Sequence, residues 1–177
     1  MQTAFHSAVA LAARATPFAR SQHVLKETGP AGFAAETHVM TDQGAQPVSA
    51  LLAGDRVYDT MGHAHELRAL TANTLSHCVA IRIAPGALGT DWDLGELLVG
   101  SGQLLALSNW RTRILGVGSA LLPAAKLTEE LGVSAVTLPR LTLYTLHFDT
   151  FATIRTNGIE AGVAPLDALP DQAGTLH

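Results

Sequence analysis

The chain has 177 residues, of which 47% are hydrophobic and 15% are charged, a composition typical of one globular domain with its own hydrophobic core. The formal net charge is −4, and the 11 Lys and Arg residues are spread along the sequence without a basic stripe, which argues against nucleic-acid binding. The single cysteine, Cys78, excludes an intrachain disulfide, and no apolar stretch is long enough to span a membrane.

Residues 1–31 are expected to form an N-terminal extension that is partly helical. Pro17 ends the first helical pattern, and the pair Gly29 and Pro30 marks the boundary with the rest of the chain. A secretory signal carries its positive charge before the apolar run, whereas Arg14 here follows one. The sequence therefore favours a cytoplasmic location.

From Phe33 onward, short β-type runs alternate with turn residues, which predicts a compact all-β body. The pattern predicts strands at residues 37–41, 56–59, 67–70, 79–83, 97–99, 104–107, 141–148 and 151–156. Asn157-Gly158 is the strongest hairpin signal in the chain and predicts a tight turn after the last of these strands.

Two short helical elements are expected within this body. One is a helical turn at residues 48–52 that Gly54 ends, and the other is a helix at residues 121–131 with Pro123 in its first turn and Gly132 at its end. Residues 166–177, with Pro170 and many small side chains, are expected to be a loosely ordered tail. The domain proper is thus expected at residues 32–165.

Three stretches of the chain carry short motifs, and the order and spacing of these motifs are informative. The stretches are GFAAETHVMTDQGAQPVSALLAGDRVYDTMG (32–62), VAIRIAPGALG (79–89) followed by LLVGSGQLLAL (97–107), and LLPAAKL (121–127) followed by LYTLHFDTFATIRTNGIEAG (143–162). Together they resemble the bacterial branch of the Hint (Hedgehog/intein) superfamily. The resemblance implies a compact fold of short antiparallel β-strands with one or two short helices.

The resemblance also implies a chemistry, protein self-processing by an acyl shift. In that family a Cys, Ser or Thr at the first position attacks the preceding peptide bond, and a His deep in the fold protonates the leaving amine. The first position corresponds here to Gly32 and the His position to Leu104, neither of which can do this chemistry. Asp149 matches an acidic residue that lies near the reacting site in the family.

The sequence therefore predicts a Hint-type domain that has kept its fold and lost self-processing, serving as a binding or structural module. Its expected partner is another protein or its own parent polypeptide. No cofactor, nucleic acid or membrane is expected to bind, and nothing in the sequence sets the oligomeric state.

Two alternatives remain open from the residues themselves. Self-processing could continue through a displaced nucleophile, Thr37 or Thr28, if its amide were strained. Alternatively, a small cupin-like β-barrel could bind a metal through His63 and His65, which share a face of a strand, with His147 as a further ligand.

Overall fold

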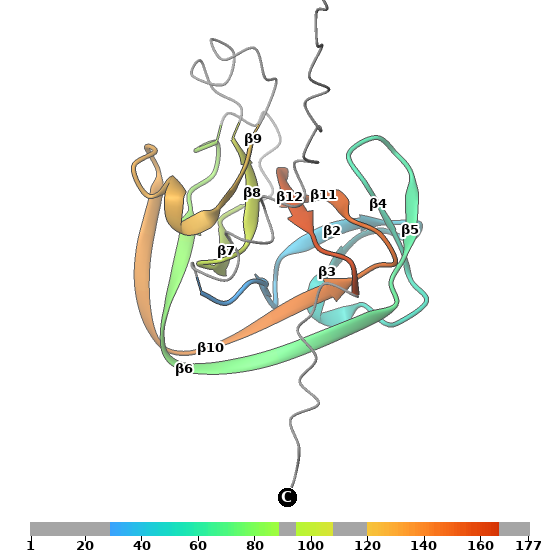
Figure 1. Cartoon of the computed structure of the whole chain (residues 1–177), viewed down its shortest axis with the longest axis horizontal. Helices are drawn as coiled ribbons and strands as arrows, with labels where there is room; N and C mark the ends of the chain where they lie inside the picture. Colours follow the sequence, from blue (N-terminus) through green and yellow to red (C-terminus); the bar gives the residue numbers. More distant parts are fainter. Residues whose placement is uncertain (1–28, 89–94, 108–119, 167–177) are drawn as a thin grey trace, which may run out of the picture.

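The computed structural model describes residues 29–88, 95–107 and 120–166, and these form a mainly β fold of two sheets (Figure 1). The first sheet closes into a small barrel in the order β1-β10-β6-β7, and the second runs in the order β5-β4-β2-β11-β12-β8-β9 with β3 beside β2. The strands of the first sheet are β1 (Phe33–Ala34), β6 (Ala69–Ile83), β7 (Leu97–Gly100) and β10 (Val133–His147). Those of the second are β2 (His38–Thr41), β3 (Gly44–Pro47), β4 (Arg56–Tyr58), β5 (Ala64–Glu66), β8 (Leu104–Leu107), β9 (Ala120–Pro123), β11 (Ala152–Thr156) and β12 (Ile159–Val163).

A long two-stranded ribbon, β6 paired antiparallel with β10, gives the molecule its outline (Figure 1). Each strand has 15 residues, and their ladder runs from Ala69 opposite His147 to Ile83 opposite Val133. The ladder is interrupted where His77, at a φ of 48°, faces Pro139, which has no N–H to donate. The two strands bend together (Figure 1), so one ribbon reaches both ends of the molecule.

The Asn157-Gly158 hairpin is confirmed by the structure. These two residues join β11 to β12 with φ values of 46° and 87°, the positive values that a type I′ turn requires. The Asn157 side chain ties the turn to its surroundings, because its Oδ1 accepts the His38 N–H at 2.7 Å and its Nδ2 donates to the Glu96 carbonyl.

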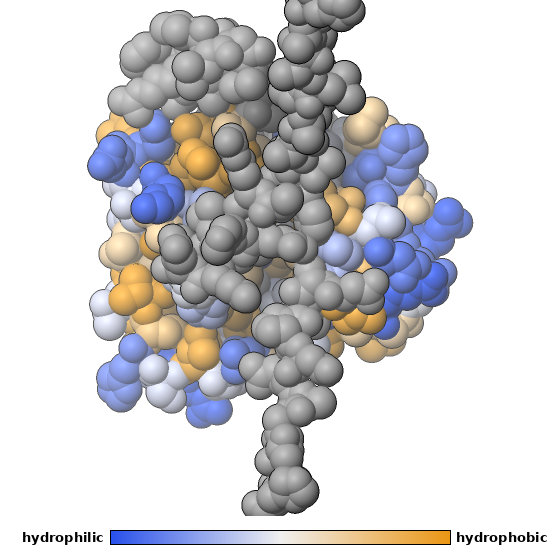
Figure 2. All heavy atoms as spheres, viewed as in Figure 1, coloured by the Kyte–Doolittle hydropathy of each residue, from blue (hydrophilic) through white to orange (hydrophobic). Residues whose placement is uncertain are grey.

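One continuous core lies between the two sheets. Phe33, Phe148, Leu105, Leu146 and Ile154 are among its fully buried large side chains. On the face shown in Figure 2, hydrophilic residues gather over the β4–β5 edge of the second sheet. No helix among residues 29–88, 95–107 and 120–166 is long and apolar enough to cross a membrane.

The all-β fold class is confirmed, but two expected details are wrong. The helix expected at residues 121–131 is instead strand β9 followed by the 3-10 helix η2 (Ala124–Leu127). Leu121 and Leu122 pair with β8, and Leu131 is 93% exposed, so these leucines do not share one helical face. The other 3-10 helix, η1 (Val48–Ala50), confirms the helical turn expected there.

The second wrong detail is strand length. The expected short strands at 67–70 and 79–83 are replaced mainly by the single strand β6, and the one at 141–148 is the second half of β10. The intervening residues, Thr71 to Thr74, are exposed, so they show no burial alternation that a sequence pattern would reveal. Of the expected extension and tail, residues 1–28 and 167–177 lie outside the described residues.

Candidate functional site

The peptide bond between Ala31 and Gly32 is held at both of its polar atoms. The Gly32 N–H donates to Oε1 of Gln103 at 3.1 Å, and the Thr145 hydroxyl donates to the Ala31 carbonyl at 3.3 Å. Gln103 comes from the turn before β8, and Thr145 comes from β10. Two elements far apart in the sequence therefore fix one amide plane, at the point where the resemblance places the reacting bond.

Gln103, not Leu104, is the residue that faces this peptide. Its side chain is buried, and its Nε2 donates to the carbonyls of Gly162 at 2.8 Å and Leu104 at 3.2 Å. Leu104 begins β8 and its Cβ lies toward Gly162. Residue 103 therefore lies opposite the Gly32 amide, where the resemblance had suggested residue 104. Neighbouring residues of an extended chain point to opposite faces, so only one of the two can face the amide.

One signal in the sequence could have identified Gln103. It is the polar residue directly before the apolar run of β8, and a polar side chain beside buried positions must find hydrogen-bond partners. Its three hydrogen bonds use both ends of the amide, so Gln103 fixes the turn as well as the Gly32 amide.

Position 32 is shaped for glycine. Its φ of +131° lies in a region that side-chain-bearing residues rarely adopt. A Cβ there would lie 3.0 Å from the Tyr144 carbonyl oxygen and 3.1 Å from both the Leu143 Cβ and the Thr145 hydroxyl. A nucleophilic side chain at this position would therefore require both the backbone and its neighbours to move.

Residues 29–32 cross the loop that joins β7 to β8 in very close backbone contact. The Gly100 N–H donates to the Gly32 carbonyl and the Gly102 N–H to the Pro30 carbonyl, each at 2.9 Å. A Cβ at Gly100 would overlap the Pro30 carbonyl, and one at Gly102 would overlap the Gly29 carbonyl. We call this contact, formed by Gly29–Gly32 against Gly100–Gly102, the glycine crossing.

Thr37, one of the two candidate displaced nucleophiles, lies in no such arrangement. Thr37 is buried in the turn before β2, where its N–H donates to the Ala34 carbonyl and its own carbonyl accepts the Val48 N–H. Its N–H is thus held in a turn, and its carbonyl is held by the residue that follows β3. Thr28 lies outside the described residues.

Asp149 forms an ion pair with Arg68 at the protein surface. Arg68 donates from Nε to both carboxylate oxygens at 2.9 Å and from Nη2 to Oδ2 at 2.7 Å, and it also pairs with Glu66. The hydrogen bonds from Arg68 lower the pKa of Asp149. This geometry makes Asp149 an ion-pair partner that ties the end of β10 to the start of β6.

His63 and His65 converge on a carboxylate. The Asp59 Oδ2 lies 3.1 Å from Nδ1 of His63 and 3.1 Å from Nε2 of His65, and Oδ1 accepts the backbone N–H groups of Met61 and His63. Burial acts to raise the pKa of Asp59, but the hydrogen bonds from His65 and His63 outweigh it, so the pKa lies well below its usual value.

The third proposed metal ligand, His147, is engaged elsewhere. Its ring is buried beside β6, where Nε2 lies 3.0 Å from the Thr71 hydroxyl, and desolvation lowers its pKa. Among residues 29–88, 95–107 and 120–166, no group of three or more His, Cys, Asp or Glu side chains is placed to hold a metal ion.

The Asp59 cluster leads to a testable pH dependence. A carboxyl whose pKa is lowered on folding adds stability above its ordinary pKa, near 3.8, and loses that contribution as the pH falls toward the folded value. Asp59→Asn is therefore expected to cost about 2 kcal/mol at pH 7 and progressively less between pH 4 and pH 2. Urea denaturation of both proteins across this range measures the difference.

The matched control for this experiment is Asp149→Asn. Asp149 pairs with Arg68 at an exposed site, where an ion pair contributes little. The Asp149→Asn substitution should therefore change the free energy of unfolding less than Asp59→Asn does at pH 7. A cost of Asp59→Asn that stayed constant from pH 7 to pH 2 would show that the charge of Asp59 has no part in it.

Comparisons with known proteins agree with the β fold described above. A family model described as the Hint domain matches residues 31–163. A bacterial intein-like domain from Clostridium thermocellum superposes with a TM-score of 0.51 at 13% identity, over 75% of this chain and 97% of that chain. The splice-inactive AceL NrdHF class 3 split intein superposes with a TM-score of 0.50 at 8% identity, over 76% and 97%.

At such low identity these two structures establish the shared fold alone. No curated protein sequence matches the chain. The family model, in contrast, spans most of the sequence, and its first matched residue, Ala31, is the one whose carbonyl is held by Thr145. The chain therefore belongs to the Hint domain family.

Proposed function

We propose that this Hint domain does not cleave its own backbone and serves instead as a module that holds the polypeptide preceding it. The observation that carries the proposal is the Ala31–Gly32 peptide, which is bound at both polar atoms but lacks a side chain at Gly32. The expected partner is accordingly its own parent polypeptide, which enters the domain through residues 29–32.

The chemistry supports this proposal. An acyl shift needs a thiol or hydroxyl on the residue after the scissile bond, and Gly32 has neither. The leaving amine must then gain a proton, but Gln103, which faces that nitrogen, carries an amide that does not titrate. Both requirements therefore fail at the same peptide bond.

The Thr145 hydroxyl is the neighbouring group that most needs a test. It lies at the Ala31 carbonyl oxygen and donates to it, a contact that fixes the carbonyl. The buried imidazole of His147, two residues further along β10, is hydrogen-bonded to the Thr71 hydroxyl. Thr145 therefore supports the peptide in the proposed module.

We expect the purified full-length chain to keep its intact mass through days of incubation at pH 7, with or without added thiol or hydroxylamine. These nucleophiles trap a thioester or ester, and none forms without a nucleophile at position 32. Intact-protein mass spectrometry is the measurement. A fragment cut between residues 31 and 32 would contradict the proposal, and its loss in Thr145→Val would assign the attack to that hydroxyl.

A gain-of-nucleophile variant extends this test. Gly32→Cys is expected to remain uncleaved under the same conditions, because Gln103 still cannot protonate the amine and the new side chain is crowded by Tyr144 and Leu143. Thiol-dependent cleavage of this variant would show that position 32 alone accounts for the lost chemistry, and would remove Gln103 from the explanation.

A further inference from the structure

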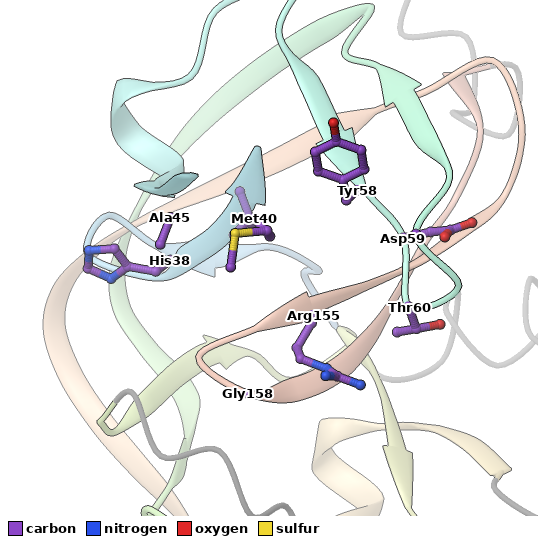
Figure 3. Close-up of a pocket in the computed structure, with 10 residues that line it drawn as sticks. His38, Met40, Ala45, Tyr58, Asp59, Thr60, Arg155 and Gly158 are labelled. Atoms are coloured by element: carbon purple, nitrogen blue, oxygen red, sulfur yellow. The ribbon is translucent and has the colours of Figure 1, made fainter. Parts of the chain in front are cut away.

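A pocket opens on the second sheet, away from the contacts of the Ala31–Gly32 peptide. It has a volume of about 380 Å³. Its walls come from β2, β3, β4, the turn after β4 and the β11–β12 hairpin (Figure 3). The lining residues are His38, Val39, Met40, Ala45, Tyr58, Asp59, Thr60, Gly62, Arg155 and Gly158.

The chemistry of these walls suits an aromatic side chain. The surface is mostly apolar, and Met40, 46% exposed, projects its thioether into it (Figure 3). A thioether adapts its shape and makes favourable contacts with aromatic rings, and the Tyr58 ring on the neighbouring strand β4 offers edge or face contacts. A Trp or Phe side chain with part of its backbone is of the size that a pocket of this volume takes.

The charge of the pocket points to an acidic neighbour. The Asp59 carboxylate is turned away from Arg155 (Figure 3). It already forms four hydrogen bonds, with Met61, His63 and His65. Arg155 pairs with Glu160 only at 3.6 Å, with both side chains partly exposed, a kind of pair that contributes little. The Arg155 guanidinium can therefore turn to a carboxylate on a ligand.

We propose that this pocket binds an aromatic side chain flanked by carboxylates on another polypeptide. The ring packs over Met40 and Tyr58, which lie next to one another on the paired strands β2 and β4; Arg155 can lie over its face, and an adjacent carboxylate pairs with the same guanidinium. This inference is independent of the proposed function, since none of the lining residues contacts the Ala31–Gly32 peptide among the hydrogen bonds described above.

The full-length chain can report such binding through its methionine methyl groups. With 13C-methyl-labelled Met, the Met40 methyl lies in the pocket, while Met61, 81% exposed on the turn between the lining residues Thr60 and Gly62, serves as a comparison at the rim. Titration with the peptide Ac-Asp-Trp-Asp-NH2 should shift the Met40 resonance saturably by the ring current of the indole. The Met61 resonance should move much less than that of Met40.

Two control peptides separate the ring from the charge. Ac-Asn-Trp-Asn-NH2 keeps the ring and should bind a few-fold more weakly, as expected for the loss of about 1 kcal/mol from an exposed charge pair. Ac-Asp-Ala-Asp-NH2 keeps the charges and should leave Met40 unmoved. Equal affinity of all three peptides would overturn the proposal, as would the absence of a saturable shift at millimolar peptide.

A matched pair of variants locates the charge contact. Arg155→Gln should remove the preference for the acidic peptide over the Asn peptide. Arg140→Gln, an exposed arginine of β10 outside the lining, should keep it. A preference that survived in Arg155→Gln, or a shift of Met61 as large as that of Met40, would show that the peptides bind elsewhere.

Discussion

Gly100→Ala is expected to lower the free energy of unfolding by about 3 kcal/mol, the upper end of the usual cost of overpacking a well-fitted site. A methyl group at this position would overlap the Pro30 carbonyl and lie 2.8 Å from Cδ1 of Leu143. The backbone at Pro30 cannot yield without breaking the hydrogen bonds of the glycine crossing. Urea denaturation followed by circular dichroism measures the loss.

Gly44→Ala is the matched control for this substitution. Gly44 has a φ of +95°, but a Cβ there would meet nothing within 4 Å. It should therefore cost only the backbone strain, about 1 kcal/mol. If Gly100→Ala cost no more than Gly44→Ala, the close approach of the two segments at the glycine crossing would be refuted.

Gln103→Leu should be comparably damaging, with an expected cost of about 3 kcal/mol or more. The substitution removes the acceptor for the Gly32 N–H and the donor to the Gly162 carbonyl, both in a buried setting. A buried polar group left without its partner costs about 1–3 kcal/mol, and here two groups are affected. Thermal and urea unfolding measure the change in stability.

Hydrogen exchange of the Gly32 amide is a second measurement of the effect of Gln103→Leu. The Gly32 amide is expected to exchange fast in Gln103→Leu and slowly in the parent chain, because its acceptor is gone. Gln43→Leu, an exposed glutamine in the β2–β3 turn, should alter stability by less than about 0.5 kcal/mol. Unchanged protection of Gly32 in Gln103→Leu would mean that another group holds that amide.

The local features of this fold could be predicted from the sequence. Asn157-Gly158 sets its own turn through two positive φ values, and the alternation of Val79, Ile81 and Ile83 predicts a strand with one buried face. Ile81 and Ile83 are buried as this pattern predicts, whereas Val79 is 50% exposed. The helix at 121–131 was wrong because Leu121 and Leu122 obtain their hydrogen bonds from β8, a partner that no local pattern reveals.

The candidate site was harder to predict because its contacts are distant in sequence. Gln103 and Gly32 are 71 residues apart, and choosing residue 103 over 104 depends on which face of the chain meets the amide. The glycines at 100 and 102 look like turn residues in the sequence. Their tight fit against Pro30 and Gly29 exists only once the segments are together.

The hydroxyl of Thr145 reaches a carbonyl 114 residues earlier in the chain, and this separation bears on how the protein is made. During translation Ala31 is synthesised long before β10. Residues 29–32 therefore stay accessible to proteases and chaperones until nearly the whole domain has been synthesised. Pairing of such remote strands is slow, because a large loop must close before any contact stabilises it. The contacts of the Ala31–Gly32 peptide with Thr145 and Gln103 are consequently among the last to form.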